Sequence, residues 1–302
     1  MFGSVVRKLP TILLSTLAIA AVACTTAAPA PTATAAPPPK AATAAPAAPT
    51  PTVVAATSAP TKASAPAAAS TATPAAPSAT ITLQWFGQST FLLTTSSGTK
   101  LLMDPAAPST GYNTQPIQGV DVVTISHEHA DHNYLALAPG NPVVLRGLKE
   151  NDWAQVDQAV KDIKIRSYPT YHDAEGGAKR GKNAIFVLEA DGLRLAHLGD
   201  LGHPLTQEQA TALGKLDVLM VPVGGFYTID AAEATQLATQ LSPKVVVPMH
   251  YKTPKMQANW PGGPVDPFLE GKKVERVGSN KVMISKDKLP AVMTVYVLGY
   301  ES

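Results

Sequence analysis

The chain has 302 residues, with 24 basic and 22 acidic side chains and a formal net charge of +2. Residues 1–79 hold four basic residues and no acidic one, which leaves 20 basic and 22 acidic residues, a net charge of −2, in residues 80–302. A domain this close to neutral shows no electrostatic footprint for nucleic-acid binding, which requires a clustered basic surface, so we expect no nucleic-acid partner. The single cysteine, Cys24, excludes a disulfide framework and a zinc site built on several thiolates.

Residues 1–24 have the layout of an export signal. Arg7 and Lys8 precede an apolar run of 12 residues, 12–23, which is shorter than the roughly 20 residues of a membrane-spanning helix. The end of this run, Ala21–Cys24, resembles a bacterial lipobox, although Ala21 stands where lipoboxes usually have Leu. We therefore expect an exported protein of the cell envelope, anchored to the membrane by lipid on Cys24. Plain secretion after cleavage at Ala23 is the alternative.

Residues 25–79 are expected to form a disordered linker. Ala, Pro, Thr and Ser account for 51 of these 55 residues, and such a composition cannot build a packed core. The linker carries no chemistry of its own. Residues 80–302 are left to form one globular domain.

From Ile81 onward, short apolar runs alternate with turn residues, which is typical of strands. The first three runs are closely spaced and predict an antiparallel meander, and Asp191-Gly192 predicts a tight hairpin. Strands are expected at residues 81–86, 91–95, 100–103, 120–125, 143–145, 163–168, 184–189, 193–198, 218–223, 245–249 and 292–298. Helices are expected at 150–160, at 206–213 behind Thr206, and at 230–241 behind a capping box of Asp230 and Glu233. Two sheets covered by helices satisfy this count.

Three imidazoles and a carboxylate follow the strand expected at 120–125, at His127, His129, Asp131 and His132. Neutral imidazole and carboxylate are ordinary ligands of divalent metals, and gathering them beside a buried strand is costly unless a cation lies among them. The spacing is not that of His-Glu-x-x-His on a helix. Instead, His127 and His129 project from the same side of an extended segment.

This motif resembles the signature His-x-His-x-Asp-His of the metallo-β-lactamase superfamily. Three more residues match that family in order, each after a β-like run: His172 in Pro169–Asp173, Asp200 in His197–Asp200, and His250 in Val247–His250. The resemblance covers residues 81–302 and implies an α/β (α+β) fold, the four-layer αββα sandwich.

The resemblance also implies a ligand set for two divalent metal ions. One ion would be held by His127, His129 and His172, the other by Asp131, His132 and His250, with Asp200 bridging them. Zn²⁺ is the expected metal, and Mn²⁺ or Fe suits the same ligands. Asp104, which ends an early strand, is expected to support the site from behind its ligands.

Such a centre predicts hydrolysis by a metal-bridging hydroxide that Asp131 orients. Two divalent ions set against Asp131, Asp200 and a hydroxide leave a charge of about +1, which favours an anionic substrate. We therefore expect a binuclear hydrolase of a small anionic ester or lactone, with oligomeric state left open. A phosphodiesterase or phospholipase-type hydrolase of the envelope is one alternative. A non-catalytic, metal-binding envelope lipoprotein is another, although the intact ligand set speaks against it.

Departures from the family pattern narrow the choice of branch within the superfamily. The site has no cysteine ligand, and a bridging Asp200 is uncharacteristic of true β-lactamases. Only 49 residues separate Asp200 from His250, too few for the large inserted domain of the nuclease branch. The runs Trp85–Ser89, Gly199–His203 and Pro222–Gly225 resemble the branch of L-ascorbate-6-phosphate lactonase, and they indicate a branch more than a substrate.

His203 is a candidate catalytic residue, because it lies three residues after Asp200 on a glycine-flanked loop. It would orient substrate or donate a proton, and the alternative is a histidine that stabilises the loop. His197 is expected to be a packed residue beside the site. Glu128 is expected to be a surface carboxylate, because it points away from its histidine neighbours.

Two further segments lie near the expected site. Tyr227 and Thr228 follow a Gly-Gly pair and either line the mouth of a pocket or make ordinary loop contacts. Lys179, Arg180 and Lys182 form a charge run near His172, for which a solvated loop is the expectation and an anion-attracting rim the alternative.

Overall fold

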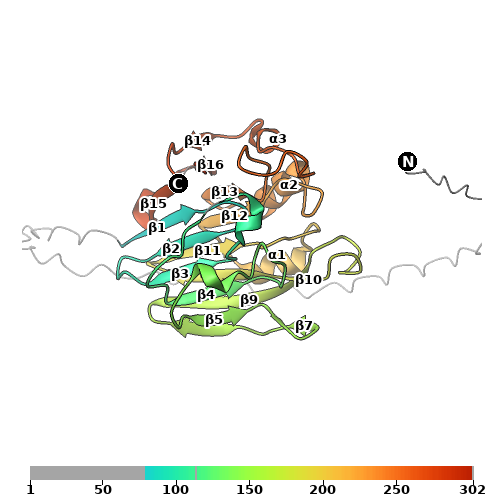
Figure 1. Cartoon of the computed structure of the whole chain (residues 1–302). Helices are drawn as coiled ribbons and strands as arrows, with labels where there is room; N and C mark the ends of the chain where they lie inside the picture. The colour runs from blue at the N-terminus through green and yellow to red at the C-terminus, as the bar shows by residue number, and fades with distance from the viewer. Residues whose placement is uncertain (1–78, 113, 301–302) are drawn as a thin grey trace, which may run out of the picture. The chain divides into compact units, whose positions relative to one another are not determined.

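The computed structural model describes residues 79–112 and 114–300 (Figure 1). The leader predicted at residues 1–24, including Cys24, and the linker predicted at 25–79, apart from Ala79, lie outside the described residues. In the described part of the chain, none of the helices combines the length and the apolar character that crossing a bilayer demands.

One sheet has six strands, in the spatial order β15 (Lys281–Ser285), β1 (Thr80–Trp85), β2 (Phe91–Thr94), β3 (Lys100–Met103), β4 (Val122–Ile125) and β5 (Val143–Arg146). The predicted meander is confirmed, because β1, β2 and β3 pair antiparallel. β4 and β5 continue the sheet in parallel. β15 pairs with β1, so segments some 200 residues apart in sequence lie side by side, with Thr80 opposite Ser285 (Figure 1).

The other sheet has eight strands, in the order β14 (Val274–Arg276), β16 (Thr294–Val297), β13 (Val245–Met249), β12 (Val218–Pro222), β11 (Leu193–His197), β10 (Lys182–Ala190), β9 (Ile163–Tyr171) and β8 (Asp157–Val160). β9, β10 and β11 pair antiparallel, whereas β11, β12 and β13 are parallel. The predicted hairpin at Asp191-Gly192 is confirmed, and both residues have positive φ, +51° and +74°. β6 (Leu148–Lys149) and β7 (Asp152–Trp153) form a separate pair.

The α-helices are α1 (Gln207–Leu213), α2 (Ala231–Leu241) and the short α3 (Asp266–Leu269). The 3-10 turns are η1 (Pro108–Thr110), η2 (Leu135–Leu137) and η3 (Lys286–Lys288). The predicted N-caps are confirmed: Thr206 caps α1 and Asp230 caps α2, and each forms a reciprocal capping box with the residue three positions later.

The helix predicted at residues 150–160 is wrong, since this segment forms β7 and β8. Glu150 has φ of +57°, which a continuing helix does not allow. The Trp153 indole donates hydrogen bonds to the carbonyls of Thr170 and Asn183, both at 2.9 Å, and β8 pairs along β9. Tertiary pairing with the long β9–β10 hairpin therefore overrides the local helical pattern.

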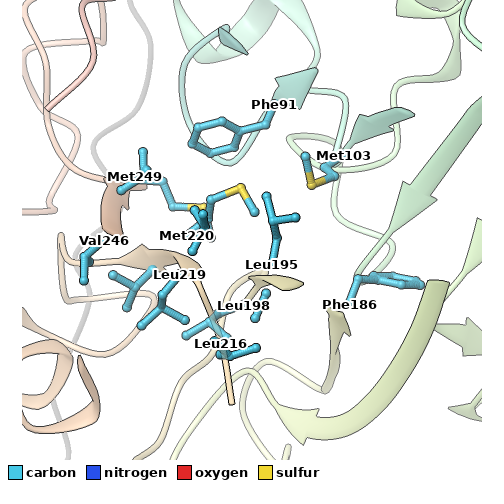
Figure 2. Close-up of a cluster of buried hydrophobic side chains, with 14 of the residues drawn as sticks. Phe91, Met103, Phe186, Leu195, Leu198, Leu216, Leu219, Met220, Val246 and Met249 are labelled. Atoms are coloured by element: carbon cyan, nitrogen blue, oxygen red, sulfur yellow. The ribbon is translucent and has the colours of Figure 1, made fainter. Parts of the chain in front are cut away.

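The two sheets face each other across the hydrophobic core (Figure 2). Phe91 and Met103 of the six-stranded sheet face Leu195, Met220 and Met249 of the other sheet, and all five are buried. Alternate residues of the eight-stranded sheet, such as Leu219 and Val246, point to its opposite face.

The outer faces of the two sheets are covered differently. Ala210 and Leu213 of α1, with Ala234 and Leu237 of α2, join the core cluster of the eight-stranded sheet. On the outer face of the six-stranded sheet, a smaller cluster gathers around Leu102, Val123, Ile125, Leu137 and Ala138, so η2 and its neighbours provide the cover there. The predicted mixed sandwich is confirmed, with its longer helices on the eight-stranded sheet.

Candidate metal centre

The predicted site residues follow strands that end at one edge of the sandwich. β9 and β11 run in the same direction, because β10 is antiparallel to both, and β13 shares this direction through the parallel pairs β11–β12 and β12–β13. His172 and His250 come directly after β9 and β13, and Asp200 comes three residues after β11. The fourth segment, His127–His132, follows β4 of the facing sheet. Parallel strands therefore bring side chains from distant parts of the sequence to one place.

The segment after β4 turns sharply, so that its polar side chains meet. The His132 N–H donates to the His129 carbonyl at 2.9 Å, and the rings of His127 and His129 approach to 3.0 Å between Nε2 and Nδ1. Glu128 points outward, as predicted, and pairs with Arg146 at 2.5 Å on the surface. His127 and His132 are buried, whereas His129 is exposed.

Asp200 lies at the centre of the cluster. Its Oδ1 lies 3.2 Å from His132 Nε2. Its Oδ2 lies 3.3 Å from the Nε2 atoms of both His172 and His250, and 3.9 Å from His127 Nε2. A tetrahedral zinc ion with bonds of about 2.0–2.1 Å separates its ligand atoms by roughly 3.3–3.5 Å, so these spacings suit metal coordination.

Two sets of donors meet here with all ligand atoms of each set within 4.8 Å of one another. The first set is His127, His129 and His172, and the second is Asp131, His132, Asp200 and His250. The structure thus brings together all seven residues that the sequence predicts as ligands. His132 Nε2 is buried without a hydrogen-bond partner, and such an orphaned nitrogen among carboxylates fits a metal ion.

Asp104 holds one ligand, His132, from behind, at a fully buried position with φ of +44°. Its Oδ2 accepts a hydrogen bond from His132 Nδ1 at 2.7 Å and one from the Ser126 hydroxyl at 2.5 Å. Its Oδ1 accepts from the Ser126 N–H at 2.7 Å. The bond to Asp104 fixes the proton of His132 on Nδ1 and leaves Nε2 free to act as a ligand.

The turn between β1 and β2, Gly87–Thr90, supports the cluster from below, a role that the sequence pattern does not indicate. The Gln88 amide lies 3.5 Å from Asp131 Oδ2, and the Gln88 carbonyl accepts from the His250 N–H at 3.2 Å. The Ser89 hydroxyl lies 3.5 Å from Asp200 Oδ1. All of these groups are buried, apart from the partly exposed Asp131, and Gln88 has φ of +46°.

Two glycines let loops approach the main chain of the ligands. A Cβ on Gly202 would lie 2.2 Å from the carbonyl carbon of His172, and one on Gly224 would lie 2.3 Å from the His250 oxygen. The Asn183 side chain also accepts from the Asp200 N–H at 3.0 Å. The runs Gly199–His203 and Pro222–Gly225 therefore have a packing reason for their glycines.

The buried environment shifts the pKa values of the cluster's histidines in opposite directions. Burial, with His132 next, lowers the pKa of His127 well below its ordinary value. Burial also acts to lower the pKa of His250, but Asp200 and Asp131 raise it to about 9. For Asp200, burial acts to raise the pKa, yet His132 and His250 lower it well below the usual range. At neutral pH without metal, protonated His250 therefore neutralises part of the carboxylate charge.

The cluster opens into a cavity of about 320 Å³. Its lining residues are His129, Asp131, His172, Arg180, Asp200, Tyr227, His250 and Trp260. A second cavity of about 360 Å³ shares Asp131, Tyr227 and Trp260 with it. A larger cavity of about 460 Å³ lies elsewhere, where charges such as Arg194 and Glu189 pair with each other, so the chemistry and not the size locates the site.

The mouth of the first cavity is aromatic. The Trp260 ring lies 5.6 Å from the His250 ring and 6.1 Å from the Tyr227 ring. Tyr227 lines the cavity, whereas Thr228 is buried and its hydroxyl donates to the Ile229 carbonyl at 3.1 Å. Trp260 follows no strand and stands in a loop, so no sequence signal marked it.

His203 does not line either cavity beside the cluster. Its Nε2 accepts from the Tyr171 N–H at 3.1 Å, and its Nδ1 lies 2.9 Å from the Pro204 carbonyl. Both ring nitrogens are thus occupied by main-chain groups, which favours the loop-stabilising interpretation. His197 is fully buried, with Nε2 2.8 Å from the Ser89 carbonyl, as a packed residue beside the site.

A comparison with protein families matches residues 82–250 to the β-lactamase superfamily domain, a match that ends on the last histidine of the cluster. The chain belongs to the metallo-β-lactamase superfamily. A UPF0173 metal-dependent hydrolase of Pyrobaculum neutrophilum is 31% identical over 228 residues, which cover 68% of this chain and 96% of that protein. One of Caldivirga maquilingensis is 28% identical over 57% of this chain and 82% of that protein.

A solved structure from Thermotoga maritima, named as a candidate Zn-dependent hydrolase of the metallo-β-lactamase superfamily, is 36% identical. It aligns with a TM-score of 0.57 and covers 72% of this chain and all of that chain. The chain is therefore a member of the UPF0173 family of metal-dependent hydrolases, and its His/Asp cluster is where metal can bind.

Proposed function

We propose that the domain is a binuclear hydrolase of small anionic esters or lactones. The observation that carries this proposal is the position of Asp200, whose two oxygens lie 3.2–3.3 Å from His132, His172 and His250, imidazoles that belong to both donor sets. A carboxylate shared in this way suits a ligand that bridges two ions.

The residues present fit such a pair of ions, and zinc is the proposed metal because the donors are mostly imidazoles. His127, His129 and His172 would hold one ion, and Asp131, His132 and His250 the other. Bound there, two divalent ions would make water more acidic and polarise the group under attack. The surplus of positive charge favours an anionic substrate.

The protein's own groups position the reactants. Burial acts to raise the pKa of Asp131, but His132 and His250 lower it below its ordinary range, so the carboxylate stays ionised. Its oxygens are available to accept a hydrogen bond from the attacking water and orient it. Tyr227 and Trp260 line the cavity, and their rings would limit the access of bulk water to one side of the reacting group.

The test combines metal quantitation with a substrate screen on the purified chain. We expect about two equivalents of zinc and turnover of simple lactones or esters, with His132→Ala as the blank. Bis(p-nitrophenyl) phosphate is included to separate this activity from phosphodiesterase action. One equivalent of metal, or turnover of the phosphodiester alone, contradicts the proposal.

Export and membrane attachment through Cys24 are also part of the proposal. They rest on the charged and apolar segments of residues 7–23 and on the position of the single cysteine. Expression in a bacterial host with a radiolabelled fatty acid tests them. Label should appear in the wild-type chain and be absent from Cys24→Ala, and an unlabelled, released wild-type chain would point to plain secretion.

A further inference from the structure

Arg180 differs from the two lysines of its charge run. Lys179 pairs with Glu175 at 2.5 Å, and Lys182 pairs with Asp152 at 2.9 Å. The Arg180 guanidinium forms no ion pair with any residue in the described part of the chain. It is also the member of the run that lines the cavity of the metal cluster. Arg180 is therefore the cation of this run that lines the cavity without an ion-pair partner among the described residues.

The Arg180 side chain is held in place by rings. Its guanidinium carbon lies 5.5 Å from the centre of the Tyr227 ring and 5.9 Å from that of Phe226. Its main-chain N–H donates to Asp173 at 2.7 Å, and Asp173 also accepts from the N–H groups of Gly177 and Lys179. Stacking on aromatic faces orders a guanidinium and leaves its N–H groups free for a planar acceptor.

Phe226 has an unusual position that this contact explains. Its side chain is 62% exposed, and its φ is +60°, a left-handed conformation that is costly for a bulky residue. Burial in the core does not account for this strain. The ring instead meets Tyr227 edge-on at 4.8 Å and lies beneath Arg180. The strained loop thus forms a platform for one cation.

We propose that Arg180 binds an oxyanion of the substrate, a carboxylate or a phosphate monoester, while the scissile bond lies over the metal cluster. This inference rests on the proposed function and makes its substrate class more specific. A guanidinium matches the two coplanar oxygens of either group. Charged hydrogen bonds of this kind correspond to roughly 10- to 100-fold in affinity.

The first test uses a matched pair of substrates, 4-nitrophenyl hexanoate and the 4-nitrophenyl monoester of adipic acid, which replaces the terminal methyl group with a carboxylate. The wild-type chain should prefer the adipate ester in kcat/KM. Arg180→Gln should lower this preference about 10- to 100-fold. Arg180→Lys keeps the positive charge but loses the two parallel N–H donors of the guanidinium. Its preference for the adipate ester should therefore lie between those of the wild type and Arg180→Gln. The matched control Lys179→Gln, which removes a neighbouring charge outside the cavity, should keep the preference.

The second test measures binding without turnover. Calorimetric titration with adipate and with hexanoate should give a tighter dissociation constant for adipate in the wild type and nearly equal constants in Arg180→Gln. Parallel titration with 6-phosphonooxyhexanoate shows which oxyanion Arg180 prefers, and Arg180-dependent binding of either one supports the inference.

The two proposals fail in different ways. A chain that hydrolyses none of the esters but binds adipate through Arg180 contradicts the proposed function and keeps only the oxyanion-binding role of Arg180. A chain that hydrolyses both esters, with the preference unchanged in Arg180→Gln or equally reduced in Lys179→Gln, overturns this inference and keeps the function.

Discussion

The floor and the mouth of the cavity are built by different interactions. On the floor, Asp104, Ser89 and Asp200 are buried, and polar contacts between β-strand ends and the turn Gly87–Thr90 set their positions. At the mouth, Arg180, Tyr227 and Trp260 are half-buried and meet mainly through their rings.

This difference indicates which residues can change without loss of the proposed reaction. A buried polar group that loses its partner costs its full desolvation energy, so the floor tolerates little change. Ring contacts near solvent are less directional, so the mouth can vary in shape and charge. Under the proposed function, metal binding and water activation would belong to the floor, and the choice of substrate to the mouth.

Asp200→Ala should produce the largest effect, because it removes the carboxylate shared by both donor sets. We expect the second equivalent of metal to be lost and kcat to fall by about 10³-fold, or about 4 kcal/mol. Metal analysis and steady-state kinetics measure both quantities. Asp157→Ala, at an exposed carboxylate on β8, is the control and should change neither. Full activity with both metals in Asp200→Ala would refute the binuclear mechanism.

Asp104→Asn tests the buried carboxylate that supports the ligand His132 from behind. The amide keeps the shape of the carboxylate but weakens its hydrogen bond to His132 Nδ1. Loss of such an outer partner lowers metal affinity by about 10- to 100-fold. Competition with a chelator measures the affinity, and Asp157→Asn is the matched control. An unchanged affinity would mean that Asp104 serves the fold alone.

Metal binding should release protons at pH 7. The pKa of His250 is raised to about 9 in the metal-free protein, so this ligand carries a proton at pH 7 that the metal must displace. Binding should therefore strengthen as the pH rises toward 9, and the part of the proton release that comes from His250 should vanish above that pH. Calorimetry in two buffers of different ionisation enthalpy counts the protons. Equal heats in both buffers at pH 7 contradict the expected state of His250.

His203→Ala should have the smallest effect. The change removes contacts to the Tyr171 N–H and the Pro204 carbonyl, so we expect a loss of about 1 kcal/mol in the free energy of unfolding. Turnover should stay within about threefold of wild type, because His203 lies outside the cavity. Urea unfolding and kcat are the measurements. A large loss of kcat with unchanged stability would support the catalytic role considered from sequence.

All seven residues of the candidate ligand set could be found from the sequence, because of their spacing and their positions after strands. Four of them lie within six residues, His127–His132, and the others follow apolar strands in the order of a known family. The residues that support the ligands, such as Ser89, belong to no comparable sequence motif. Ser89 and Asp200 are 111 residues apart, and only the pairing of strands brings the turn beneath the cluster.

Tertiary partners also decide what the sequence left open or assigned wrongly. The run Lys179–Lys182 contains three cations, and which of them is unpaired depends on Glu175 and on the distant Asp152. The segment 150–160 and the unpredicted β15 are set by pairing with β9 and β1. Such strands at a sheet edge form because they pair with strands that are distant in sequence, and a short stretch of sequence does not contain these partners.

The place of β1 has a mechanical consequence. β1 lies between β15 and β2, so a force applied at Thr80 is resisted in shear by the hydrogen bonds on both of its flanks. β1 leads directly into the turn beneath Asp131 and Asp200. A chain stretched from its N-terminal side would therefore transmit tension to the turn beneath the metal cluster before the sheet could come apart.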